Sequence, residues 1–362
     1  MKTNLPKKFS SLAGVVFSIA SFCAPLPAGS GGIAVPDTVM RRIYNEVRTP
    51  FKYGIVVRAG PDQVVDCPAV FRHGRSWFMA YIAASHKVGY ETFLAQSDDL
   101  LHWKTLGKIL PFPDAGWDQW QCAGDIALQD TQWGGSYELQ PYDGKFWMSY
   151  IGGRLKGYET DPLSIGMSWT TSPEKPQPWN RFPENPVLSP SQPDARDFEK
   201  LTLYRSNIIW DHGKTLGQPF VMFYNAKTKN GYERIGVAVS SDMIHWKRRG
   251  EHAVVANGEA KQRGISGDPQ IVRIGETWVM FYFGTGWKPK AFDTFACSYD
   301  LTTWTKWEGP HLIEPSQPWD KTYAHKPWLI KHDGVVYHFY CAVGDDGRNI
   351  AVATSKDLRS WK

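Results

Sequence analysis

The 362-residue sequence has few cysteines, no lysine- or arginine-rich run and no dense metal-ligand spacing. Its 5 cysteines include no Cys-x-x-Cys pair, which argues against a zinc site, and we expect most of them to be small buried hydrophobes. Without a basic run the chain has no electrostatic footprint for nucleic acid. Its glycine-rich stretches lack the order of a phosphate-binding loop. What remains is a globular chain that is 42% apolar and 14% aromatic.

The N-terminus has the layout of a secretory signal. Three lysines precede an apolar run from Leu12 to Cys23, and small residues with prolines follow. This layout predicts a signal peptide over residues 1–28 and a secreted or periplasmic protein. The run is too short for a spanning helix, which needs roughly 20 apolar residues. A lipoprotein anchor at Cys23 is the alternative, and the bulky Phe22 before it argues against that reading.

One pattern, Ser-x-Asp-x-x-x-Trp, recurs along the chain. Regular copies occupy residues 97–103, 240–246, 298–304 and 355–361, and an irregular copy ends at Trp179. Ser and Asp side chains can bond the backbone of their own turn, while Trp can pack between neighbouring sheets. We therefore interpret the signature as structural and not as catalytic.

Before each copy of the signature come an apolar strand, a polar turn and an aromatic strand. The expected apolar strands are residues 66–71, 137–140, 205–209, 268–272 and 325–329. The aromatic strands are residues 77–81, 146–150, 220–224, 278–282 and 336–340. Five such units, each with four strands, predict an all-β, five-bladed β-propeller over residues 51–362.

The first residues of the propeller are expected to close its ring. The fifth unit lacks sequence for a fourth strand, and residues 51–58 resemble that kind of strand. We expect them to complete the last blade and remove its open edge. Residues 29–50 form an N-terminal extension, in which Asp37 to Val47 predicts a short amphipathic helix capped by Asp37. Residues 33–50 could also reach a neighbouring subunit, which leaves a dimer open.

Polar residues at the start of the innermost strands should face one shared channel. They are Asp66, Glu138, Arg205 with Asn207, Asp268, and His325 with Lys326. Carboxylates in one apolar-walled pocket push each other's pKa values apart, so that an acid and a base can coexist. No cofactor is required for such chemistry. A structural divalent cation at the propeller axis is the alternative use of these oxygen and imidazole groups.

Residues 50 to 362 resemble the five-bladed β-propeller glycoside hydrolases related to families 43, 117 and 130, with family 117 closest in pattern. The resemblance is carried by Asp66-Cys67-Pro68, Gly267-Asp268-Pro269, His325-Lys326-Pro327 and the repeated turn. It implies an exo-acting, inverting glycosidase that cleaves oligosaccharides. Asp66 would be the base that activates water, and Asp268 would orient groups and tune pKa values. His325 or Glu138 would be the acid.

Substrate binding is assigned to polar channel residues and to aromatic residues in loops. The polar set is Arg205, Asn207 and Lys326, and Trp117, Trp120, Trp133 and Trp287 could stack on sugar faces. Two alternatives stay open. A glycoside phosphorylase would use Arg205, Lys326 and His325 to hold phosphate. A non-catalytic sugar-binding propeller is disfavoured by the three carboxylates in the channel.

Overall fold

The computed structural model describes residues 1, 32–85, 88–257, 264–286 and 290–359. The expected signal peptide with Cys23, as well as Trp287 and Trp361, lies outside the described residues. Within those ranges, no helix is both long and apolar enough to cross a membrane. Cys67, Cys122, Cys297 and Cys341 are buried and free, which confirms the expectation of small buried hydrophobes.

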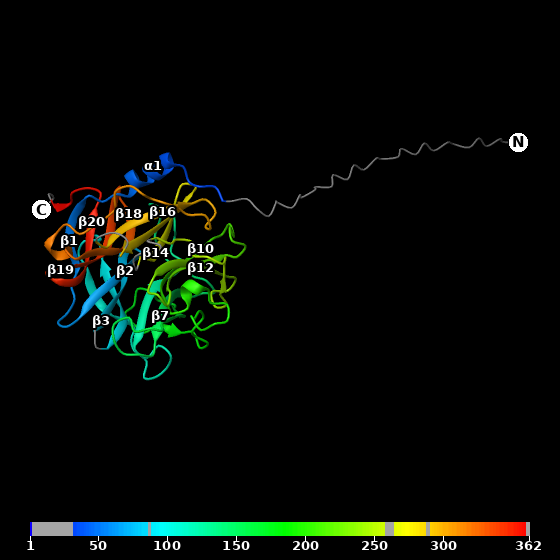
Figure 1. Cartoon of the computed structure of the whole chain (residues 1–362), viewed down its shortest axis with the longest axis horizontal. Coiled ribbons are helices and arrows are strands. Elements are labelled where there is room, and N and C mark those ends of the chain that lie inside the picture. Colours follow the sequence, from blue (N-terminus) through cyan, green and yellow to red (C-terminus); the bar gives the residue numbers. More distant parts are fainter. Residues whose placement is uncertain (2–31, 86–87, 258–263, 287–289, 360–362) are drawn as a thin grey trace. The chain divides into compact units, whose positions relative to one another are not determined.

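The strands pair into five four-stranded antiparallel blades (Figure 1). The first blade contains β2 (Val64–His73), β3 (Ser76–Ser85), β4 (Gly89–Ser97) and β5 (Lys104–Leu110). The second contains β6 (Gln121–Ile126), β7 (Phe146–Gly153), β8 (Ser164–Thr170) and β9 (Asn180–Arg181). The third contains β10 (Thr202–Trp210), β11 (Phe220–Lys227), β12 (Glu233–Ser240) and β13 (Lys247–Arg248).

The fourth blade contains β14 (Ile265–Ile274), β15 (Thr277–Thr285), β16 (Phe292–Ser298) and β17 (Thr305–Lys306). The fifth contains β18 (Tyr323–His332), β19 (Val335–Gly344), β20 (Gly347–Thr354) and β1 (Phe51–Val57). Short 3₁₀ turns occupy Asp197–Glu199 and Pro318–Asp320. The inner strands β6, β10, β14, β18 and β2 contact one another in that order. This is the predicted five-bladed β-propeller.

The ring closes between the N-terminal strand and the last blade. β1 pairs antiparallel with β20, from Phe51 opposite Thr354 to Val57 opposite Ile350. Lys52 of β1 also forms an ion pair with Asp320, whose side chain is fully buried. The prediction that residues near 51–58 complete the fifth blade is confirmed, and the pairing leaves β20 without an open edge.

The predicted helix is α1 (Asp37–Val47), which lies beside β16 and β18 in Figure 1. Its period of 3.6 places Met40, Ile43 and Val47 on one buried face, which packs into a cluster with Phe281. The N-cap residue is Pro36, so the expected cap at Asp37 is wrong. Asp37 lies inside the first turn, where its carboxylate pairs with Arg41 on the exposed surface.

The repeated turn is held by its own side chains. Ser97 Oγ accepts a hydrogen bond from the Leu100 amide at 3.0 Å, and Asp99 Oδ1 accepts from the next two amides. The Trp103 indole donates to the Leu100 carbonyl at 3.0 Å, and its ring packs edge-on against Phe339 of the fifth blade. A closely similar set of bonds recurs in the third and fourth blades. The structural interpretation of the signature is confirmed.

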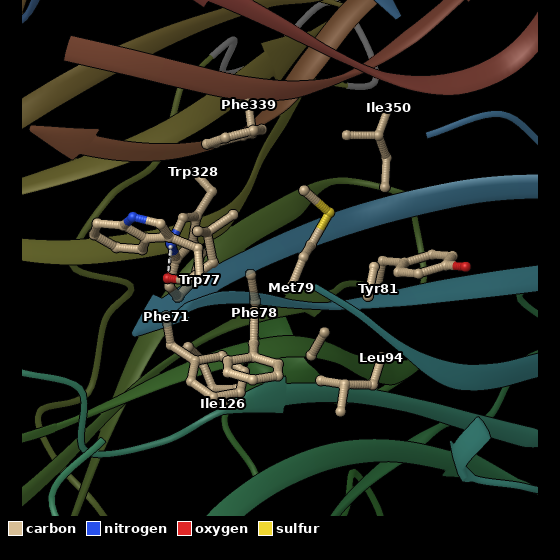
Figure 2. Close-up of a cluster of buried hydrophobic side chains, with 14 of the residues drawn as sticks. Phe71, Trp77, Phe78, Met79, Tyr81, Leu94, Ile126, Trp328, Phe339 and Ile350 are labelled. Carbon is tan, nitrogen blue, oxygen red and sulfur yellow. Dashed lines mark hydrogen bonds between the residues drawn. The ribbon is translucent and has the colours of Figure 1, made fainter. Parts of the chain in front are cut away.

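Large apolar side chains fill the space between the first and fifth blades (Figure 2). Phe71 and Met79 of the first blade meet Trp328 and Phe339 of the fifth, and all four are 0% or 1% exposed. The Trp328 indole donates to the Val70 carbonyl at 2.9 Å, which satisfies its only polar atom. Each side chain of this size contributes about 1.5–3 kcal/mol by leaving water, so the blades adhere strongly.

The inner strand of the second blade differs from the prediction. β6, and not residues 137–140, pairs with β7. Residues 127–145 connect the two strands, and Glu138 forms only an isolated bridge with Arg72. β6 reads Gln-Cys-Ala-Gly-Asp-Ile, in which small residues and a glycine weaken the strand pattern. Residues 137–140 resembled the other units because they precede a hairpin turn at Asp143-Gly144.

Candidate active site

Four inner strands carry a bulge at the same place, near the end of the channel. The pairing of their first residues shifts at Asp66/Ala69, Leu203/Ser206, Gly267/Gln270 and His325/Trp328. Cys67, Asp268 and Lys326 adopt positive φ angles of 50°, 52° and 65° there. Each precedes a proline, which has no N–H for the strand ladder. Bulges redirect side chains, and here they bring sequence-distant groups to one place.

A cavity of about 180 Å³ opens at this end of the propeller. Its lining comes from the second to the fifth blades: Tyr158, Glu159, Tyr204, Asn225, Glu233, Ile265, Asp268, Phe283, Thr285, Ala291, Tyr323, His325, Lys326 and Arg348. It is smaller than the roughly 300–1,000 Å³ of pockets for drug-sized ligands, so it suits a single small ring. A second cavity of about 20 Å³ shares Glu159, Tyr204, Asp268 and Lys326, and continues to Cys67 and Arg205.

Asp66 anchors two cations beside the cavity. Its Oδ2 accepts from Lys326 Nζ and from Arg348 Nη1, both at 2.9 Å, and its Oδ1 accepts from the Cys67 amide. Burial opposes ionisation, but the charges of Lys326 and Arg348 hold the pKa of Asp66 well below its usual range. Asp66 is 1% exposed and lines neither cavity, whereas both cations line the larger one.

Arg205 points from the third blade to the second. Its Nε donates to Asp125 Oδ2 at 2.7 Å and its Nη2 to the Pro68 carbonyl at 2.9 Å, while Nη1 has no acceptor within the described residues. Burial raises the pKa of Asp125 to about 6, against the opposing charge of Arg205. Asp125, on β6, thus stands where Glu138 was expected. Asn207 lines neither cavity, because its Oδ1 accepts from the Ile271 amide and ties two blades together.

Two glutamates that the sequence analysis missed line the cavity. Glu233 opens β12, is buried, and accepts a hydrogen bond from Asn225 Nδ2 at 2.8 Å. Burial raises the pKa of Glu233 to about 8, and the charge of Glu159 adds to the shift against the Asn225 bond. Glu159 lies in the loop after β7, with its side chain 33% exposed and 3.8 Å from Lys326 Nζ. A search limited to inner-strand starts could reach neither position.

Asp268 and His325 lie in the cavity wall, as predicted. Burial raises the pKa of Asp268, which accepts a weak bond from Cys67 Sγ at 3.5 Å. Burial lowers the pKa of His325 to about 3, so its imidazole is neutral at neutral pH. A neutral imidazole is a poor proton donor to a leaving group. Its ring lies edge-on to Phe283, with centroids 5.2 Å apart.

Several predicted site residues lie elsewhere. Glu138 is exposed and lines neither cavity. The Trp133 indole donates to Glu46 Oε1 and so fastens α1, and Trp117 packs on Tyr150. Trp120 lies under Lys156 Nζ at 4.2 Å. The loop tryptophans thus pack on the protein itself. Among the described residues, no group of three or more His, Cys, Asp or Glu side chains could hold a metal ion.

Comparisons with known proteins agree with this architecture. Residues 179–312 match the model of glycoside hydrolase family 130, described as beta-1,4-mannooligosaccharide phosphorylase. Two solved structures, one described as a complex of BT0996 with RGII and the other as a glycoside hydrolase, are each 46% identical to this protein, with a TM-score of 0.85. Each alignment covers 90% of this protein and 96% of the other. No curated protein matches.

More distant structures share the fold. A thermostable family-43 glycoside hydrolase is 16% identical over 82% of this protein and 90% of its own length, with a TM-score of 0.58. A family-130 structure, from work on glycoside hydrolases that target beta-1,2 mannosidic linkages in Candida mannan, is 15% identical. It covers 84% of this protein and 92% of its own length, with a TM-score of 0.60. On the identity and coverage of the nearer structures, the chain belongs to the five-bladed β-propeller glycoside hydrolases related to families 43 and 130.

Proposed function

We propose that this protein is an exported, exo-acting glycoside hydrolase in which Glu233 is the general acid and Glu159 the general base. The observation that carries the proposal is a pair of carboxyl groups that share one small cavity but differ in their surroundings. The pKa of Glu233 is raised to about 8, so Glu233 keeps its proton at neutral pH. Glu159 is more exposed and faces the cation Lys326, which favours its carboxylate form. This is the division of roles that glycoside cleavage requires.

Glu159 suits the role of base better than Asp66, which the family resemblance had suggested. Both Asp66 oxygens accept hydrogen bonds from protein groups, and its depressed pKa makes it a weak base. Asp66 then positions Lys326 and Arg348 for contact with sugar hydroxyls. In the inverting reaction that the resemblance implies, Glu159 takes a proton from water as it attacks the anomeric carbon. Glu233 protonates the departing oxygen.

The cations around the cavity favour hydrolysis over phosphorolysis. Binding of phosphate would need uncommitted positive charge. Arg205 is paired with Asp125, Lys326 and Arg348 share Asp66, and His325 is neutral. The acidic lining also favours an uncharged terminal sugar over one that carries a carboxylate. The relative described as a complex with RGII supports an oligosaccharide of that kind as the substrate.

The test is release of terminal sugar from a panel of oligosaccharides, those of RGII included, with and without phosphate. We expect release without phosphate, with the inverted anomer as the first product by NMR. Glu233→Gln should lower turnover of oligosaccharides about 10²- to 10⁴-fold, the range of general acid catalysis. The same variant should retain activity on 2,4-dinitrophenyl glycosides, whose leaving group needs no proton. Glu159→Gln should lose both activities.

Glu138→Gln is the matched control, because it makes the same change on the exposed surface and should leave both rates unchanged. Release that depends on phosphate would favour the phosphorylase. Sugar binding without turnover by the wild-type protein would favour the non-catalytic propeller. If Glu233→Gln cleaves oligosaccharides as fast as the wild type, Glu233 is not the acid.

A further inference from the structure

An aromatic wall leads from the inside of the cavity to its mouth. Phe283 and His325 lie within it, 5% and 6% exposed, with ring centroids 5.2 Å apart. The ring of Tyr323 follows at 5.7 Å from His325 and is 40% exposed. All three line the cavity and come from the fourth and fifth blades. The wall therefore continues from the buried site onto the accessible surface.

Tyr323 is unusual among the exposed aromatic residues. Within the described residues, the large aromatic side chains classed as exposed are Phe51, Tyr299 and Tyr323, and of these only Tyr323 lines the cavity. Its backbone is fixed, because it opens β18 opposite Val343 and bridges to Ala291. An exposed aromatic ring on rigid backbone at the edge of a concave site is a preformed surface for a ligand.

The size of the cavity decides which part of a substrate can reach this ring. A space of about 180 Å³ holds one sugar ring, so the next sugar of an oligosaccharide must lie at the mouth. The apolar C–H face of a sugar packs on an aromatic ring. We propose that Tyr323 is the platform on which the leaving-group sugar stacks, which makes the site selective for oligosaccharides over glycosides of small alcohols. This inference rests on the proposed hydrolase function.

The test compares two substrates with the same terminal sugar. One is the disaccharide that the wild type cleaves fastest, and the other is the glycosyl fluoride, whose leaving group is too small to reach Tyr323. Tyr323→Ala should lower kcat/KM for the disaccharide about two- to tenfold, the value of one aromatic contact. It should leave kcat/KM for the fluoride unchanged. Tyr323→Phe keeps the ring and should retain the wild-type ratio of the two constants.

Tyr299→Ala removes an equally exposed tyrosine away from the cavity and is the matched control. Equal loss on both substrates, or no loss on either, would overturn the inference while leaving the hydrolase intact. Failure of the wild type to cleave both the fluoride and the disaccharide would overturn the proposed function, and this inference with it. A thermal melt of each variant separates loss of folding from loss of binding.

Discussion

Replacing Asp66 by Asn distinguishes an anchor for cations from a catalytic base. The substitution keeps the shape of the side chain but leaves Lys326 and Arg348 without their shared counter-charge. Removal of one partner from a buried ion pair costs about 3–5 kcal/mol. We therefore expect Asp66→Asn to lower the free energy of unfolding by that amount.

The expected change in melting temperature follows from the size of the folded unit. Residues 33–362 unfold with an entropy of roughly 2.1 cal/mol/K per residue, or about 0.7 kcal/mol/K in total. Asp66→Asn should therefore lower Tm by about 4–7 °C. Asp346→Asn breaks an exposed ion pair with Arg58 and is the control, with an expected loss under about 1 °C.

Calorimetry at several pH values adds a second check. Because the folded pKa of Asp66 is depressed, its contribution to stability is present above the unfolded pKa of about 3.9 and is lost as the pH falls towards the folded value. The difference in Tm should therefore stay constant from pH 5 to 8 and shrink below about pH 4. Hydrolysis should fall as well, since both cations line the cavity. A variant with wild-type Tm but more than 100-fold slower hydrolysis would refute the anchor and restore Asp66 as the base.

Three further predictions follow from the same geometry. The kcat/KM of the wild type should fall as the pH rises through about 8, where Glu233 loses its proton, and Glu233→Gln should lack this limb; a fall unchanged in the variant contradicts the assignment. Because folding raises the pKa of Glu233, the wild type loses stability from pH 4.5 to 8, so the variant should gain Tm over it towards pH 8. Deletion of residues 50–60 removes the partner of β20 and should prevent folding, and a soluble, cooperative propeller would disprove this. Trp304→Ala should cost about 3 kcal/mol and lower Tm by about 4 °C without changing kcat/KM, because the ring packs only on Phe223 and on its own turn.

Local chemistry made much of the fold predictable. The Ser-x-Asp-x-x-x-Trp turn specifies itself, since Ser97 and Asp99 bond the backbone within three residues. The 3.6 period of Met40, Ile43 and Val47 marked α1 to its ends. The missing fifth-blade strand could be inferred because five units need twenty strands. The inner strand of the second blade was misplaced because β6 has a weak pattern and a loop follows it.

For the active site, the sequence by itself placed Asp66, Asp268, His325 and Lys326 together, because each follows the same position of a repeat. Only the tertiary structure brought in Glu233, from the third strand of its blade, and Glu159, from an irregular loop. It also decided protonation. Burial holds a proton on Glu233 and keeps His325 neutral, while two neighbouring cations keep Asp66 ionised. Those states depend on solvent exclusion and on charges distant in sequence, which no local pattern encodes.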